Sequence, residues 1–221
     1  MVKKLLFLLV GIGVVIGGVA AMSAFESHVI NVTAHIENAL KVLPVTKDLQ
    51  FGTVFPQEYH ERRIWITTSE SFCAGSQRRV LNIDYKIAQK PKCINDAGEY
   101  APVDYATEEC PTGYEEMPVL CHYLSKTPVD NDPKPYTDYG IPPFHQPTDV
   151  ATGTINKDHD LLDEWIIDLA VPCFEGMCAQ DWPEFVRKYN PLADPHEFEA
   201  PGDPSGTDFG CDLWVEVTKI Y

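Results

Sequence analysis

The sequence is poor in basic residues. Its 221 residues include 17 Lys and Arg against 33 Asp and Glu, a formal net charge of −16. Because phosphate recognition needs a basic surface, this balance excludes a general nucleic-acid binder. It also disfavours adhesion to an anionic membrane face. The classes that remain are acidic soluble domains, cation binders and surface proteins.

Catalytic motifs are also missing. His60-Glu61 and His196-Glu197 do not continue to H-E-x-x-H, which places two zinc ligands on one helical face. The sequence contains no G-x-S-x-G elbow, phosphate-binding loop or dinucleotide fingerprint. We therefore predict a non-enzymatic protein without a catalytic metal or cofactor. A secreted hydrolase whose ligands converge from distant segments is the alternative.

Residues 1–22 have the composition of a secretory signal peptide. Lys3 and Lys4 precede an uncharged apolar run, and Val19-Ala20-Ala21 supplies small residues for cleavage. The alternative is an uncleaved anchor that contacts the membrane only through residues 5–22. Both readings place the rest of the chain outside the cytoplasm, either secreted or at the cell surface.

Seven cysteines agree with that compartment, because cysteines outside the cytoplasm are usually paired. An odd number leaves one unpaired within the chain. The sequence has no C-x2-C pair, so we expect disulfides rather than a zinc site. Two of the cysteines, Cys173 and Cys178, are each candidates to bridge to Cys211. The full set of disulfide candidates is Cys93, Cys110, Cys121, Cys173, Cys178 and Cys211.

Short alternating segments predict a mainly β protein. Alternation of apolar and polar residues, rich in β-branched types, is typical of half-buried strands. We predict strands over 28–36, 49–56, 62–68, 80–87, 151–155, 163–171 and 213–220. One helix is predicted over 178–189, with Asp181 as its cap and Pro183 in its first turn. Short strands separated by turn residues favour an antiparallel β-sandwich.

The segment 88–149 is different in character. It holds ten prolines and three cysteines and has no periodic pattern. A structureless loop of this length is uncommon in a compact domain, so we expect some internal order. We therefore predict one sandwich domain over 23–221, with 88–149 as a disulfide-held, loop-rich insertion.

Two segments near the N-terminus resemble a known family. Ala24-Phe25-Glu26-Ser27 follows the signal directly and leads into an alternating strand, and Phe51 to Glu58 reads FGTVFPQE. This order resembles the TasA/camelysin-like secreted proteins, the subunits of biofilm-matrix fibres. It is more similar still to uncharacterised secreted proteins of uncultured bacteria. The resemblance covers roughly residues 1–87, and Gln57 stands where the family tends to have Gly.

The resemblance implies a jelly-roll-like β-sandwich that forms fibres by strand donation. In such fibres the N-terminal segment of one subunit completes a sheet of the next, by pairing with an open edge. The partners would then be copies of the chain itself or other surface proteins. Transferred to this sequence, the donor and assembly residues are Phe25, Ile30, Val32, Ala34 and Ile36. The predicted function is therefore a structural subunit of the cell surface or extracellular matrix.

A ligand-binding module for calcium or glycan is the alternative function. Clustered oxygen ligands on loops suit Ca²⁺, and two acidic stretches qualify. One contains Asp130 and Asp132, with Asp138 nearby; the other contains Asp158 and Asp160, followed by Asp163 and Glu164. For a glycan, Trp65 and Trp214 lie opposite the aliphatic faces of their predicted strands and are candidates for a stacking platform.

Overall fold

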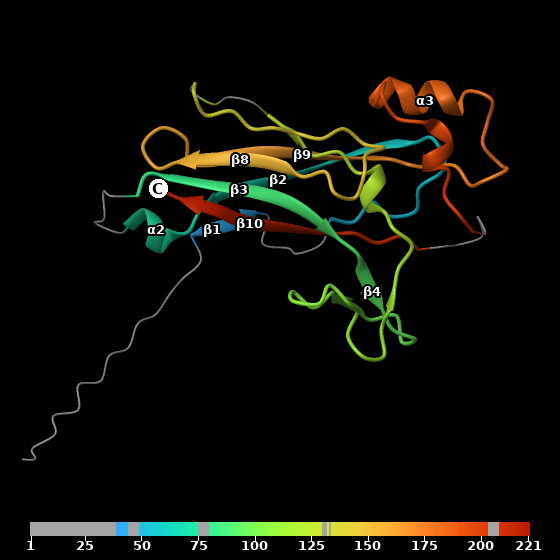
Figure 1. The fold of residues 1–221 in the computed structure, drawn as a ribbon, viewed down its shortest axis with the longest axis horizontal. Helices are drawn as coiled ribbons and strands as arrows, with labels where there is room; N and C mark the ends of the chain where they lie inside the picture. The colour runs from blue at the N-terminus through green and yellow to red at the C-terminus, as the bar shows by residue number, and fades with distance from the viewer. Residues whose placement is uncertain (1–38, 44–48, 75–79, 130–131, 133, 203–207) are drawn as a thin grey trace, which may run out of the picture. The chain divides into compact units, whose positions relative to one another are not determined.

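The structure is a computed structural model that describes residues 39–43, 49–74, 80–129, 132, 134–202 and 208–221. The proposed signal (1–22) and donor segment (Phe25 to Ile36) lie outside this range. Within it the chain is mainly β, as predicted, and consists of antiparallel sheets (Figure 1). No helix in the described part of the chain has both the length and the apolar composition needed to cross a membrane.

The first sheet has four strands, in the order β1-β2-β9-β7. Their bounds are Leu40–Leu43 for β1, Tyr59–Thr68 for β2, Leu162–Ala170 for β9 and Thr127–Pro128 for β7. Strands β2 and β9 pair along nine positions, from Tyr59 opposite Ala170 to Thr67 opposite Leu162. Both were predicted from alternation, and their inward faces are buried.

The second sheet has three strands, in the order β10-β3-β8. Their bounds are Asp212–Ile220 for β10, Asn82–Lys90 for β3 and Ala151–Asn156 for β8. The pairing of β10 with β3 shifts between Val217 and Lys219, where the register has a bulge. All three strands were predicted. However, β3 continues to Lys90, so residues 88–90, predicted as the start of the insertion, belong to the strand.

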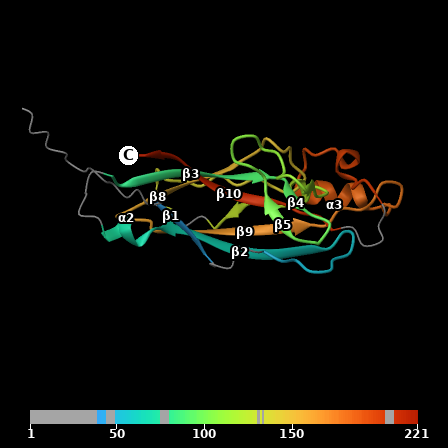
Figure 2. The ribbon, with the colours of Figure 1, turned by 90° about the horizontal axis from the view of Figure 1, so that it is seen from below.

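The two sheets face each other as the layers of a β-sandwich, seen edge-on in Figure 2. The β2–β9 and β3–β8 pairs are nested in sequence, which makes the sandwich jelly-roll-like and sends the chain between β3 and β8 on a long excursion. The core between the layers is built from Ile64, Ile66, Tyr85, Ile87, Ala151, Ile155, Trp165, Ile167 and Leu169. Burial of these apolar side chains is the main favourable term in folding.

The excursion has its own order, as expected. It begins with a small sheet in the order β5-β4-β6, and β4 leads away from the sandwich (Figure 1). The bounds are Lys92–Ile94 for β4, Tyr100–Pro102 for β5 and Glu115–Glu116 for β6. A short 3₁₀ helix, η1 (Cys121–Tyr123), then returns the chain to β7.

Three disulfides connect all six candidate cysteines. Cys93 pairs with Cys110 inside the excursion, and Cys121 joins the excursion to Cys211 just before β10. Cys173 pairs with Cys178, so neither bridges to Cys211 as the sequence analysis considered. Cys73 is the exposed cysteine left over, at the end of a short helix, α2 (Glu70–Ala74). Three disulfides indicate an oxidising compartment.

The helix at the far end of the sandwich is shorter than predicted. Helix α3 spans Trp182–Tyr189, because Cys178 is held by its disulfide and the helix begins beyond it. Pro183 lies in the first turn, but the side chain of Asp181 does not cap the helix and instead accepts a hydrogen bond from Gln57. A second 3₁₀ helix, η2 (Pro195–Phe198), packs against α3.

The strand predicted over 49–56 is wrong, because the segment is irregular. Leu49, Phe51 and Val54 pack against the core without pairing to a sheet. The backbone turns at Gly52 (φ 76°) and at Gln57 (φ 64°). Both angles lie in the left-handed region that favours glycine and interrupts a strand. The position at which the resembled family tends to have Gly thus takes a glycine-like conformation.

Candidate functional site

An acidic side chain occupies an inward position of β9. Asp163 begins the stripe that continues through Trp165 and Ile167, and it is only 3% exposed. Since successive side chains of a strand alternate between faces, Asp163 points into the sandwich rather than to solvent. A buried carboxyl group among apolar neighbours is costly unless it is paired.

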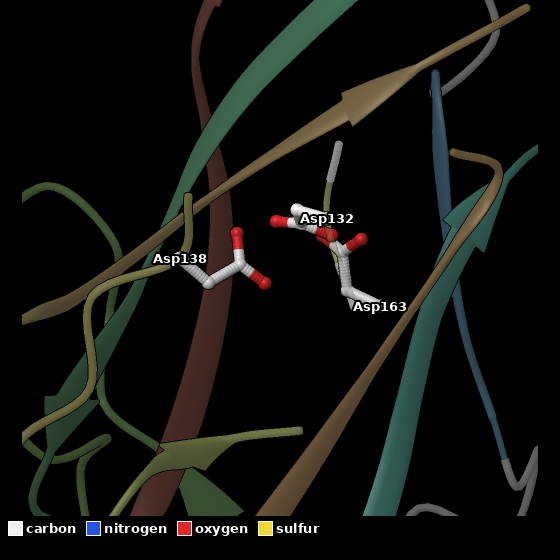
Figure 3. Close-up of side chains that lie close together, drawn as sticks. All are labelled: Asp132, Asp138 and Asp163. Atoms are coloured by element: carbon white, nitrogen blue, oxygen red, sulfur yellow. The ribbon is translucent and has the colours of Figure 1, made fainter. Parts of the chain in front are cut away.

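Two further aspartates meet Asp163 from the excursion. Asp138 is buried, and its Oδ1 accepts a hydrogen bond of 3.1 Å from the backbone N–H of Thr154 on β8. Asp132 is half-buried. One carboxylate oxygen from each of the three lies within 4.8 Å of the others. Figure 3 shows these side chains pointing toward one another from separate segments. We call Asp132, Asp138 and Asp163 the acidic cluster.

The opposite sheet supplies a hydroxyl to this cluster. Tyr85 of β3 donates its O–H to Asp163 Oδ2 at 2.5 Å and accepts the indole N–H of Trp165 at 2.7 Å. Both rings are fully enclosed and meet edge to face. Gly153 of β8 makes room for this contact, because a Cβ there would collide with the Tyr85 hydroxyl and lie 2.8 Å from Asp138 Oδ1. The cluster therefore lies between the two sheets.

Burial and mutual repulsion dominate the electrostatics of the cluster. Burial, followed by the nearby charges of Asp138, Asp160 and Asp132, raises the pKa of Asp163 to about 9. The hydrogen bond from Tyr85 acts in the opposite direction. Burial and the charge of Asp163 also raise the pKa of the Tyr85 hydroxyl, which remains a donor at neutral pH. A positive charge at this point would offset the repulsion.

The structure combines the two acidic stretches that the sequence offered separately. Asp132 belongs to the cluster, and Asp160 lies close enough to act on Asp163 electrostatically. Asp158 is exposed and lies outside the cluster, so its candidacy as a ligand is not supported, while Asp130 lies outside the described residues.

Sequence reasoning did not select two of the three cluster residues as candidate ligands. It named Asp138 and Asp163 only as neighbours of the candidates. The sequence did contain one signal that was missed. Asp163 lies two residues before Trp165 and four before Ile167, so its side chain points to the same core-facing side of the strand.

A second buried polar group lies at the other end of β3. Lys126 is fully buried, and its Nζ donates to Gln89 Oε1 at 2.7 Å. His145 Nε2 lies 3.0 Å from the same oxygen. Burial lowers the pKa of Lys126 to about 7, and burial together with the charge of Lys126 lowers the pKa of His145 to about 3. The Lys126 side chain is fully enclosed and hydrogen-bonded within the protein, which gives this group a structural character.

One long sheet edge is open. Strand β10 pairs with β3 on one side, and no described strand lies on its other side. Val217, Ile220 and the following Tyr221 are exposed at its C-terminal end. The other edge strand of this sheet, β8, meets Tyr139 through an isolated bridge at Thr152. The β10 edge is therefore the longest unpaired strand edge in the described part of the chain.

The tryptophans proposed as a sugar platform do not lie together. Trp65 belongs to β2 and Trp214 to β10, in different sheets. Trp214 stacks on Tyr105 of the excursion, with ring centroids 5.4 Å apart. Trp165 and Trp182 are buried in the core, as expected for Trp165. One shared stacking platform is thus not formed by these side chains.

Comparisons with family models, with curated proteins and with solved structures find no match to this chain.

Proposed function

We propose that this chain is a non-catalytic structural protein of the cell surface or extracellular matrix, which joins to copies of itself by strand addition. In this proposal residues 1–22 direct export, and the segment from Phe25 to Ile36 of one copy pairs with a sheet edge of the next. The observation that carries the proposal is the open edge of β10. A head-to-tail contact of this kind does not close and therefore propagates into a filament.

The β10 edge supports the proposal through its length and composition. It offers nine residues whose outer backbone groups have no strand partner among the described residues. Unpaired backbone N–H and C=O groups along an edge form a template for another chain. The exposed Val217 and Ile220 add apolar contacts for a partner. The bulge after Val217 leaves the first six residues of the strand as the more regular part of this edge.

The donor segment supports the proposal through its sequence. Residues 28–36 read HVINVTAHI, without an acidic, Lys or Arg side chain in a chain of net charge −16. Loss of Lys3 and Lys4 with the signal lowers that charge from −16 to −18. Copies of such a chain repel one another, so an uncharged segment is favoured for the contact. The three disulfides fit a protein that works in an oxidising, extracellular environment.

Sedimentation velocity tests the proposal on two versions of the chain, one starting at residue 23 and one at residue 37, which keeps all of β1. At about 0.15 M salt, where surface repulsion is screened beyond about 8 Å, we expect large assemblies from the first and a monomer from the second. Circular dichroism should show the same β signal for both. Monomers from both versions would contradict the proposal. Loss of the β signal in the shorter version would also contradict it, because the segment would then be a strand of its own sheet.

A further inference from the structure

We propose that the acidic cluster is a binding site for one hard divalent cation, with Ca²⁺ as the preferred ion, held between the two sheets of the sandwich. The ligands from this chain are carboxylate oxygens of Asp132, Asp138 and Asp163. This site goes beyond the proposed assembly function and does not depend on it.

The buried state of Asp163 is the observation that points to a ligand. Its Oδ2 accepts the Tyr85 hydroxyl, but its Oδ1 is enclosed and has no hydrogen-bond partner among the described residues. None of the ion pairs in the described part of the chain includes Asp163. A buried carboxylate oxygen without a partner loses its hydration without compensation. A cation beside Oδ1 supplies that compensation.

The donor chemistry favours a hard cation, and the arrangement favours calcium. All ligand atoms lie within 4.8 Å of one another, close enough to share one ion. The three carboxylates come from separate segments, and Ca²⁺ accepts such flexible geometry, whereas Mg²⁺ requires near-ideal octahedral geometry. The cluster offers only oxygen donors, which disfavours zinc and copper. Asp132 is half-buried, whereas Asp138 and Asp163 are buried, so Asp132 is the most exposed member of the cluster.

The position of the site gives the cation a structural role. Asp163 comes from β9 in one sheet, Asp138 is fixed to β8 in the other, and Asp132 comes from the excursion. An ion bound by all three therefore ties the excursion to both layers. Because it binds the folded chain and not the unfolded one, it raises the melting temperature with increasing concentration.

Terbium luminescence locates the site, because Tb³⁺ occupies calcium sites and is excited by an aromatic side chain close by. Trp165 is suited to this, since it contacts Tyr85, which in turn contacts Asp163. Residues 37–221 form one compact unit, so the chain from residue 23 onward retains the site. After dialysis against a chelator, we expect Tb³⁺ emission on excitation of tryptophan. Ca²⁺ should displace it at about 0.1–1 mM, the range of extracellular calcium modules, and more effectively than Mg²⁺.

Two substitutions in the cluster and one control outside it test the assignment. Asp163→Asn and Asp138→Asn keep the shape of the side chain and its hydrogen-bond acceptor, and each should weaken Ca²⁺ binding by at least tenfold. Asp158→Asn removes the same charge from an exposed position outside the cluster and should leave binding unchanged. In chelator, Asp163→Asn should melt no lower than the original chain, because it replaces an ionisable group whose charged form burial disfavours by a neutral amide of the same shape.

Three results would overturn the site. The first is an original chain without tryptophan-excited Tb³⁺ emission and without a calcium-dependent rise in melting temperature. The second is unchanged binding in both Asp163→Asn and Asp138→Asn. The third is an equal loss of binding in Asp158→Asn, which would reveal general attraction to an acidic surface.

Discussion

Lys126 is the only lysine among the described residues that is fully buried, and its amine has polar but no acidic contacts in the structure. Folding therefore removes a charge-bearing group from water, and the negative charge of Asp149 offsets this only in part. In the unfolded chain the amine has its ordinary pKa of 10.5, and in the folded chain burial lowers the pKa to about 7. Between these values the unfolded chain holds one more proton than the folded chain, so stability rises with pH.

Replacing Lys126 by Met should remove this dependence. Between pH 7 and 9 the lysine contributes a slope of up to about 1 kcal/mol per pH unit to the free energy of unfolding. Asp163, whose pKa is raised by burial, contributes a slope of opposite sign in both proteins. The difference between the original chain and Lys126→Met therefore isolates the lysine. Urea unfolding at pH 7, 8 and 9 measures it.

Lys41→Met is the matched control, because Lys41 is exposed on β1. Its unfolding free energy should follow the original chain over the same pH range. A Lys126→Met protein with an unchanged pH slope would show that the amine is solvated in the folded state.

Gly153 is required by the packing of Tyr85 against β8. Gly153→Ala places a methyl group against the Tyr85 hydroxyl and 2.8 Å from Asp138 Oδ1, both of which are buried. We expect a loss of about 1–3 kcal/mol in the free energy of unfolding, typical of overpacking. Urea unfolding of Gly153→Ala beside Thr152→Ala, at the neighbouring half-buried position, checks this. A smaller loss at 153 than at 152 would contradict the packing described for Tyr85.

At the scale of elements, alternation predicted the strands that line the sandwich. One face of each long strand packs on the core, so apolar and polar residues alternate in the sequence and reveal the strand. This holds for β2, β3, β8, β9 and β10. The segment 49–56 has apolar residues too, but positive φ angles at Gly52 and Gln57 turn the backbone, and its side chains reach the core without a strand. Apolar content alone therefore does not distinguish a strand from a packed loop.

The excursion and the acidic cluster were less accessible to sequence reasoning. Strands β4, β5 and β6 have two or three residues each, too few to show a period. Asp132, Asp138 and Asp163 come together through tertiary packing, and their separation in sequence contains no motif. The sequence also left the pairing of the cysteines open, because the paired residues meet only through tertiary packing. The carboxylate at an inward position of β9 was the one local signal of the site.

The disulfide between Cys121 and Cys211 should contribute most to stability. It closes a sequence separation of 90 residues, against 5 for Cys173 and Cys178. Chain-entropy reasoning gives about 4–5 kcal/mol for the long loop and about 2 kcal/mol for the short one. The double variants Cys121→Ala/Cys211→Ala and Cys173→Ala/Cys178→Ala should differ accordingly in urea unfolding. Equal losses would indicate that the excursion remains attached to β10 without the covalent link.

At the scale of the whole molecule, charge opposes association. A net charge of −16 before loss of the signal, and −18 after it, keeps copies apart at low salt. Assembly by strand addition needs contacts that outweigh this repulsion, and in the proposed assembly these are the backbone pairs between β10 and an uncharged donor. A cation in the acidic cluster would act inside each subunit, so the two proposals make separate predictions.

Electron microscopy of the chain from residue 23 onward, with single charges placed in the donor segment, tests strand addition most directly. Val32 lies on the apolar face of the alternating segment, and Thr33 lies on the other face. We predict filaments from the original chain and from Thr33→Asp, and none from Val32→Asp, with all three equally folded. Equal filament formation by Val32→Asp, or no filaments from the original chain at about 0.15 M salt, would contradict assembly through this segment.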